Sequence, residues 1–202
     1  MNTTAVTHNR FSRRRFVMSG LYRAAAACLP LPALARVDYG IVGRSAPDLE
    51  IDYWIDRNGE PTGFDLATTR SNWVFLKCWQ DWCPGCHSHG FPALKRIADA
   101  FVDNPHVTVV GIQTTFEGFG TNTRDKVRKI QLQYTLPITM GHDAGDLDGD
   151  HRPSTMRNYR TGGTPWMILI DPHGVVVFND FSINAERLID FLSQETASYV
   201  AP

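Results

Sequence analysis

Apolar residues follow alternating strand-like and helix-like patterns from Ala46 to the end of the chain. The segment 73–79 is almost continuously apolar, which is typical of a mostly buried strand. The segment after it carries apolar residues at helical spacing, namely Phe91, Leu94, Ile97, Ala98 and Phe101. Further strands are predicted over 49–55, 63–66, 107–113, 136–140, 166–170 and 175–178, and further helices over 123–134 and from Asn184 onward.

Turn residues mark the boundaries of these segments. Arg57-Asn58-Gly59 predicts a hairpin after the first strand, and the segment 171–174 (Asp-Pro-His-Gly) predicts a second hairpin near the end. The elements run as a hairpin, a βαβ unit, a helix and a final ββα unit. This order indicates the α/β class, with a central mixed β-sheet flanked by helices.

The composition is that of one globular domain. Of the 202 residues, 43% are hydrophobic and 20% are charged, and the net charge is -1. The sequence has no basic stripe that could bind the phosphate backbone, so we expect no nucleic-acid partner. No apolar run is long enough to span a bilayer. We expect a monomer whose folded domain covers 46–202.

Residues 1–35 have the features of an export signal. The segment 12–16 (Ser-Arg-Arg-Arg-Phe) resembles the twin-arginine signal, and a mildly apolar segment follows as far as Leu34. Ala33-Leu34-Ala35 is a small-x-small pattern, so we expect cleavage after Ala35 and a periplasmic protein. Residues 36–45 are then a linker. The alternative is a disordered basic tail of a cytosolic protein.

Cys28 offers a variant of the export hypothesis. It ends the run Ala25-Ala26-Ala27-Cys28, which resembles a lipoprotein box and would place a lipid anchor on the thiol. The leucine preferred three residues before the cysteine is missing. We therefore expect Cys28 to leave with the signal peptide.

Two of the four cysteines stand close together in Cys83-Pro84-Gly85-Cys86. Four unevenly spaced cysteines are too few for a disulfide scaffold. The pair lies between a buried strand and a helix, where the helix N-terminus lowers the pKa of a cysteine and Pro84 suits the first helical position. Cys83 is the expected exposed nucleophile, and Cys86 can resolve a mixed disulfide. Two structural or metal-ligating cysteines are the alternative.

Three separate segments carry a family resemblance. They are the pattern W-x-x-W-C-x-x-C at 79–86, Thr164-Pro165 before an apolar strand, and Ala46-Pro47-Asp48 with the hairpin after it. In these the chain resembles the thioredoxin superfamily, and most closely the TlpA/ResA-like (redoxin) branch of extracytoplasmic thiol–disulfide oxidoreductases. The resemblance covers about 46–192 and implies a thioredoxin fold with an N-terminal β-hairpin extension.

The resemblance also implies the chemistry. Cys83 and Cys86 would form a redox-active disulfide, with no other cofactor. The substrate-binding surface would consist of Trp82, Pro84, Gly85, Thr164 and Pro165. Pro165 would follow a cis peptide bond, and Thr164 would offer its backbone to the substrate. We expect a protein-disulfide reductase that acts on protein thiols and disulfides and receives electrons from a membrane donor.

The chain departs from the family pattern at three places. Lys77 stands six residues before Cys83, where thioredoxins carry a buried acid. If its side chain points to the site, the cation would stabilise the thiolate. The dipeptide between the cysteines is Pro84-Gly85, and Pro92 falls one residue later in the helix than usual. These departures leave the reduction potential and the direction of electron flow open.

The histidines after the pair allow metal-centred alternatives. The segment 83–87 spells C-x-x-C-H, the motif of c-type haem attachment. A buried strand directly before the motif is not typical of such sites. His87 and His89 could form a copper or zinc site with the two cysteines, as in a copper-carrying thioredoxin-like protein. We expect no metal, and His87, four residues after Cys83, could instead tune its thiol.

The remaining residues near the pair have simpler interpretations. Peroxiredoxin chemistry is not expected, because Gln80 and Leu76 occupy the positions where that family needs a hydroxyl residue and a proline. Cys78 is expected to be a small buried hydrophobe. Trp79 is expected in the core and Trp82 on the functional surface.

Overall fold

The computed structural model describes residues 38–145 and 152–197. The predicted signal peptide, its cleavage site and Cys28 lie outside the described residues. The strands are β1 (Tyr53–Ile55), β2 (Pro61–Thr62), β3 (Trp73–Trp79), β4 (Val107–Thr114), β5 (Thr139–Asp143), β6 (Trp166–Ile170) and β7 (Val176–Asp180). The helices are α1 (Phe91–Ala100), α2 (Arg124–Gln133), α3 (Ser154–Tyr159) and α4 (Ala185–Ala197), with a 3-10 helix over Leu66–Thr69 and a π-helix over Cys86–Gly90. Within this part of the chain, no helix has the length and apolar character to cross a membrane.

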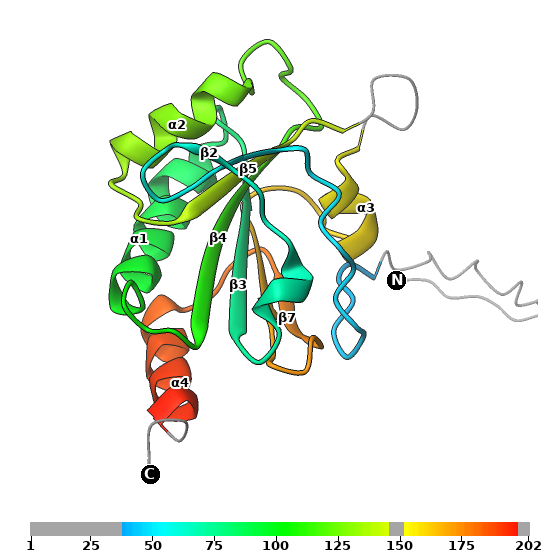
Figure 1. Ribbon diagram of the computed structural model, residues 1–202. Coiled ribbons are helices and arrows are strands. Elements are labelled where there is room, and N and C mark those ends of the chain that lie inside the picture. The colour runs from blue at the N-terminus through cyan, green and yellow to red at the C-terminus, as the bar shows by residue number, and fades with distance from the viewer. Residues whose placement is uncertain (1–37, 146–151, 198–202) are drawn as a thin grey trace, which may run out of the picture. The chain divides into compact units, whose positions relative to one another are not determined.

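The strands form one mixed sheet in the order β2-β1-β5-β4-β3-β6-β7 (Figure 1). The central strands β3, β4 and β5 are parallel, and α1 and α2 make the two crossovers that parallel neighbours need. β1 joins β5 antiparallel, and β6 joins β3 antiparallel. This is the predicted mixed sheet flanked by helices, with the β1–β2 hairpin as its N-terminal extension.

Apolar cores lie on both faces of the sheet. One lies under α1, α2 and α4, and the other under α3 and the N-terminal segment (Figure 1). Side chains alternate between the faces along β3, with Phe75 and Trp79 on the α1 side and Leu76 and Cys78 on the other. Because both faces are covered, β3 is apolar at every position except Lys77. Lys77 falls on the α1 side of this strand.

Most predicted elements are confirmed, and two strand predictions are wrong. The segment 63–66 is not a strand, because β2 ends at Thr62 and the side chain of Asp65 accepts the N–H of Ala67 at 2.8 Å to start the 3-10 helix. The strand predicted over 136–140 begins only at Thr139. The preceding residues join it to α2, and the side chain of Gln131 donates to the carbonyl O of Ile138 at 2.9 Å.

The short helix α3 was not predicted. Its N-terminus is capped from another element, because the carboxylate of Asp143 in β5 accepts the N–H groups of Ser154 and Thr155 at 3.1 and 2.8 Å. A cap supplied from a distant strand leaves no local signal in the sequence. The helix is therefore a consequence of the tertiary structure.

Residues 38–45, part of the segment predicted as a linker, pack on the domain. The N–H of Gly43 donates to the carbonyl O of Val176 at 2.8 Å, and the N–H of Gly40 donates to that of Arg160 at 2.8 Å. The side chain of Ile41 is buried in the core on the α3 side. The described part of this segment therefore belongs to the folded unit.

Candidate active site

The cysteine pair lies where β3 gives way to a helical segment. Pro84 is the first helical residue, as predicted. The N–H groups of Cys86 and His87 donate to the carbonyl O of Cys83 at 3.0 and 3.3 Å. Cys83 therefore takes the N-cap position, where N–H groups favour negative charge. Cys83 and Cys86 are both free thiols in this structure.

The Sγ atom of Cys83 contacts two backbone groups. It accepts the N–H of Cys86 at 3.2 Å and lies 3.4 Å from the carbonyl O of Thr164. The N–H donor stabilises a thiolate, whereas the carbonyl pairs with the protonated thiol. Cys83 is only 5% exposed. The prediction of an exposed thiol is wrong for this structure, because the folded chain brings Thr164 over the sulfur.

Cys86 is completely buried. Burial raises its pKa to about 12, and the charge of Lys77 acts against that rise. Burial therefore favours the protonated thiol of Cys86. An external disulfide cannot reach this sulfur. The geometry suits Cys86 for attack on Cys83 and not on a substrate.

The peptide bond between Thr164 and Pro165 is cis. Pro165 packs on the helical turns that carry the thiols. A Cβ on Gly85 would lie 3.3 Å from Cδ of Pro165, and a Cβ on Gly90 would lie 3.3 Å from its Cβ. Both glycines therefore allow the proline to approach the helix closely. This gives Gly85, in the unusual Pro-Gly dipeptide, a steric function.

The late position of Pro92 coincides with a π-helical turn. Within Cys86–Gly90 the helix widens, and the N–H of Phe91 donates to the carbonyl O of Cys86. A π-turn holds one residue more than an α-turn. The turn therefore takes up the additional residue, and α1 continues with Pro92 near its start.

Lys77 points into the protein toward the thiols. The residue is completely buried, and its Nζ lies 4.6 Å from the centre of the Phe91 ring. Burial lowers the pKa of Lys77, while the negative charges of Cys86, Cys78 and Cys83 raise it. The side chain is therefore electrostatically linked to the dithiol and does not point to solvent.

The loop before Cys83 is held by two buried amides. Trp82 is 47% exposed, and its indole N–H donates to Oε1 of Gln80 at 2.6 Å. The same oxygen accepts Nδ2 of Asn122 at 3.1 Å, and Oδ1 of Asn122 accepts the N–H of Asp81 at 2.7 Å. Sequence reasoning missed both amides as site residues. Asn122 is 42 positions away from Gln80, and nothing local marks it.

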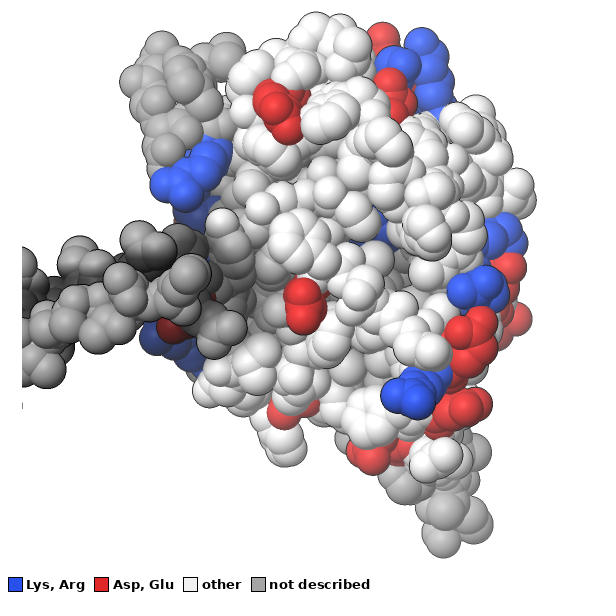
Figure 2. Space-filling view, turned by 180° about the vertical axis from the view of Figure 1, so that it is seen from behind, with Lys and Arg blue, Asp and Glu red and all other residues white. Residues whose placement is uncertain are grey.

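Exposed aromatic side chains occur near Trp82 and near the glycines that precede Thr164. They are Tyr39, Trp82, Phe119 and Phe181, each between 39% and 54% exposed. A Cβ on Gly118 would lie 3.0 Å from the Trp82 indole, and one on Gly163 would lie 3.4 Å from the Phe181 ring. Seen from behind, on the side of β7, the middle of the surface carries few charged side chains (Figure 2). Trp82 and Phe181 therefore present exposed aromatic rings on the two segments that flank the dithiol.

His87 is bonded to groups other than the thiols. Its Nδ1 lies 2.7 Å from the hydroxyl O of Tyr134, and its Nε2 contacts the carbonyl O of Asp81. Because the carbonyl only accepts, Nε2 carries the proton and Nδ1 accepts from Tyr134. His89 pairs with the hydroxyl of Ser88. Within 38–145 and 152–197, no three His, Cys, Asp or Glu side chains gather as metal ligands.

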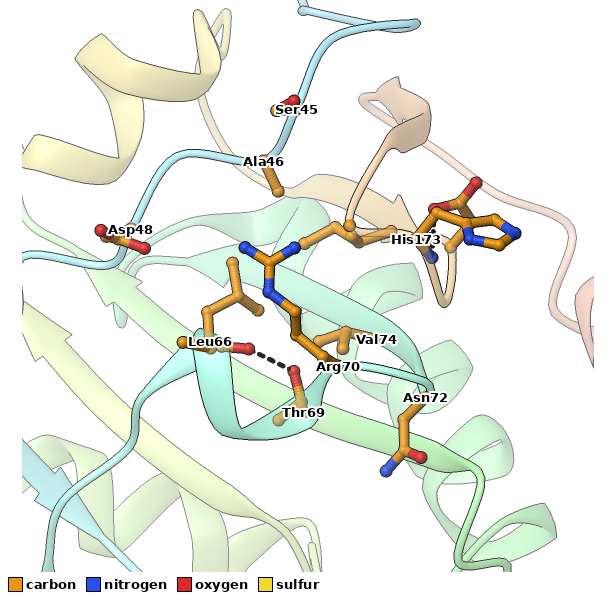
Figure 3. A pocket seen from close by; sticks show the side chains of 13 residues that line it. Ser45, Ala46, Asp48, Leu66, Thr69, Arg70, Asn72, Val74 and His173 are labelled. Carbon is orange, nitrogen blue, oxygen red and sulfur yellow. Dashed lines mark hydrogen bonds between the residues drawn. The ribbon is translucent and has the colours of Figure 1, made fainter.

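A small cavity of about 80 Å³ lies at the other end of β3 (Figure 3). Val74 and Ile170 form part of its wall, and the guanidinium group of Arg70 extends into it beside Ala46. None of the predicted site residues lines this cavity. Because β3 runs between them, the cavity and the dithiol are at opposite ends of the sheet.

The sequence matches the profile of the AhpC/TSA family over residues 42–179. No curated protein matches the chain. Several solved structures match the chain. One is the crystal structure of a thioredoxin-like superfamily protein, which is 29% identical and superposes with a TM-score of 0.65. The match covers 78% of this chain and 97% of the relative. Another is a thiol-disulfide isomerase from Corynebacterium glutamicum, which is 28% identical with a TM-score of 0.62. This match covers 74% of this chain and 95% of the isomerase.

These matches confirm the predicted thioredoxin fold. They cover nearly the whole length of each relative and most of this chain. The family match spans β1 to β7 and includes the dithiol and the Thr164–Pro165 segment. The chain therefore belongs to the AhpC/TSA family, among the thiol–disulfide oxidoreductases of the thioredoxin superfamily.

Proposed function

We propose that this protein reduces disulfide bonds in exported proteins through the Cys83–Cys86 dithiol, as a TlpA/ResA-like reductase. One observation carries the proposal. A thiol at a helix start accepts the N–H of Cys86, and the buried Cys86 thiol lies one helical turn behind it. This arrangement separates an attacking sulfur from a resolving sulfur, as disulfide exchange requires.

The exchange takes two steps. The Cys83 thiolate attacks one sulfur of the substrate disulfide, a bond forms between them, and the other substrate sulfur leaves as a thiolate. The Cys86 thiolate then attacks Sγ of Cys83. The Cys83–Cys86 bond forms, and the first substrate sulfur leaves as a thiolate. Two electrons pass from the dithiol to the substrate, and the protein ends as the disulfide.

The substrate is a protein segment laid across the Thr164–Pro165 segment. Attack by Cys83 requires the substrate disulfide to approach where the carbonyl O of Thr164 now contacts Sγ. The exposed indole of Trp82 on one side, and the Phe181 ring against Gly163 on the other, offer apolar contacts to the segment. Pro84 and Gly85 complete the surface around the sulfur.

Re-reduction needs an electron donor of lower potential. We assign this role to a membrane donor, a proposal supported by the resemblance to extracytoplasmic oxidoreductases and by the signal-like segment 12–35. Export is tested separately by replacing Arg13 and Arg14 with lysine. The expected result is loss of the periplasmic protein. A mature protein that still begins at Met1 would contradict export.

Reduction of insulin tests the activity. Cys83→Ser should abolish turnover, whereas Cys78→Ser, in the strand before the motif, should leave it within about twofold, because Cys78 is buried on the other face of the sheet. Full activity in Cys83→Ser would refute the assignment. Equilibration with glutathione measures the potential. A value near thioredoxin's, about -270 mV, indicates a reductase, and one near -120 mV an oxidant.

A further inference from the structure

Lys77 carries a buried amine, and the described residues provide no polar partner for it. Its side chain lies on the α1 side of β3, beside the aromatic rings of Phe75 and Trp79. The residue is completely buried, and among the described residues its Nζ has no hydrogen-bond partner. The ring of Phe91 compensates an ammonium charge only in part. A buried ammonium group without a hydrogen-bond partner lowers the stability of the folded state.

The amine lies between the turn that carries Cys86 and the Pro165 segment. A Cβ on Gly90 would be 2.7 Å from Nζ of Lys77 and 3.3 Å from Cβ of Pro165. Gly90 ends the π-helix that begins with Cys86. The missing side chain at Gly90 therefore leaves the space that the lysine occupies, on the inner side of the resolving thiol's turn.

The ionisable groups that act on Lys77 in the described chain are thiols, namely Cys86, Cys78 and Cys83. The neighbouring strands place Gly111 and Met167 opposite Lys77, and neither ionises. From the helices, α1 contributes Phe91, on which Tyr134 stacks at 4.5 Å. Burial, and then the charge of Cys86, raise the pKa of Tyr134. A thiolate is therefore the anion that these elements offer to the lysine.

Burial acts on Lys77 and Cys86 in opposite directions. It lowers the pKa of the lysine and raises the pKa of the cysteine to about 12. Burial thus favours the neutral form of each group, whereas the charge of either one favours the charged form of the other. Transfer of the thiol proton to the amine therefore creates an ion pair without bringing net charge into the core.

We propose that Lys77 is the proton acceptor for Cys86 in the second step of disulfide exchange, an inference that rests on the proposed function. In the mixed disulfide the Cys86 thiol gives its proton to the Lys77 amine through one bridging water. The resulting thiolate attacks Sγ of Cys83, the Cys83–Cys86 bond forms, and the substrate leaves as a thiolate. The Lys77 ammonium then returns the proton through water to that thiolate. The amine is neutral again in the disulfide form, and the proton count is unchanged.

Stopped-flow reaction with DTNB, an aromatic disulfide, separates the two steps. Attack by Cys83 releases one thionitrobenzoate, and resolution by Cys86 releases a second. The full-length protein carries Cys28→Ser throughout, because that thiol would add its own signal. Lys77→Met removes the amine but keeps an unbranched apolar chain, and Lys95→Met on α1 is the matched control.

At pH 7, Lys77→Met should leave the first phase within about twofold and slow the second by about 100-fold or more, as expected for loss of a positioned base. The second phase of the parent protein should stop rising within the range pH 6 to 10, because the Lys77 pKa lies below its usual value and the amine is then deprotonated. In Lys77→Met it should rise about tenfold per pH unit, because Cys86 then loses its proton to hydroxide. Lys95→Met should behave like the parent protein.

Two results would overturn the role of Lys77. One is a second phase with the same rate and pH profile in Lys77→Met. The other is a parent second phase that itself rises tenfold per pH unit throughout pH 6 to 10, and this measurement decides alone if Lys77→Met does not fold. A parent protein with no second phase and no insulin reduction would instead contradict the proposed function.

Discussion

The contact between Gly90 and Lys77 yields a stability prediction with a defined sign. Gly90 has helical dihedral angles, φ -65° and ψ -50°. An alanine at a helical position is ordinarily favoured over glycine by about 0.8–1 kcal/mol. Here the new Cβ would lie 2.7 and 2.8 Å from Nζ and Cε of Lys77. Such overpacking costs about 1–3 kcal/mol. The difference leads us to expect that Gly90→Ala lowers the free energy of unfolding, by up to about 2 kcal/mol.

A double-mutant cycle isolates the cause. Lys77→Val shortens the side chain to Cγ and removes both close atoms. In that background the helix preference should dominate, and Gly90→Ala should be neutral or stabilising by up to about 1 kcal/mol. The coupling free energy between the two sites is then about 2 kcal/mol. Urea unfolding of the four reduced proteins measures it.

Gly85 supplies the control for this cycle. It is also helical, but a Cβ there would meet Pro165 and no atom of Lys77 within 4 Å. The coupling between Gly85→Ala and Lys77→Val should therefore stay within about 0.5 kcal/mol. If Gly90→Ala stabilises the parent protein, or changes both backgrounds equally, the lysine does not occupy the space beside Gly90 and the reasoning is refuted.

Three further predictions concern buried polar groups. Alkylation of the folded, reduced protein should label Cys83 first and spare Cys78, whose pKa is raised by burial; equal labelling by mass spectrometry would contradict this. Asn122→Ala should cost about 1–3 kcal/mol in urea unfolding, because it leaves buried partners unsatisfied, whereas the exposed Gln133→Ala should cost less than about 0.5 kcal/mol. Burial lowers the pKa of His142, so below pH 6.5 the unfolded chain takes up a proton that the folded one does not. Stability should fall there by at most about 1.4 kcal/mol per pH unit, and a similar fall in His142→Gln would argue against His142 as its source.

Local patterns were sufficient for the elements around the dithiol. The continuous apolar run of β3, the helical spacing in α1 and α2, and Pro84 at a helix start each depend on residues within one strand or a few turns. The Cys83–Cys86 spacing likewise depends only on neighbouring residues. The fold class, the position of the thiols and the order of the central elements were therefore predictable from the sequence.

The contacts that shape the site were decided by the tertiary structure. Thr164 covers Cys83 from 81 positions away, and Asn122 holds Gln80 from 42 positions away. Such pairs have no local signal, because only the packing of the sheet and its loops brings them together. The π-turn at Cys86–Gly90 appears in the sequence only as a proline one residue late.

Lys77 shows most clearly what the sequence determined and what only the tertiary structure decided. The sequence by itself determined that a lysine stands in the strand before the dithiol, in place of the buried acid of thioredoxins. It did not determine where the side chain points, because β3 is buried on both faces and alternation alone cannot tell which face lies under α1. The packing of Phe91 and Gly90 against β3 decided that the amine lies beside the thiols.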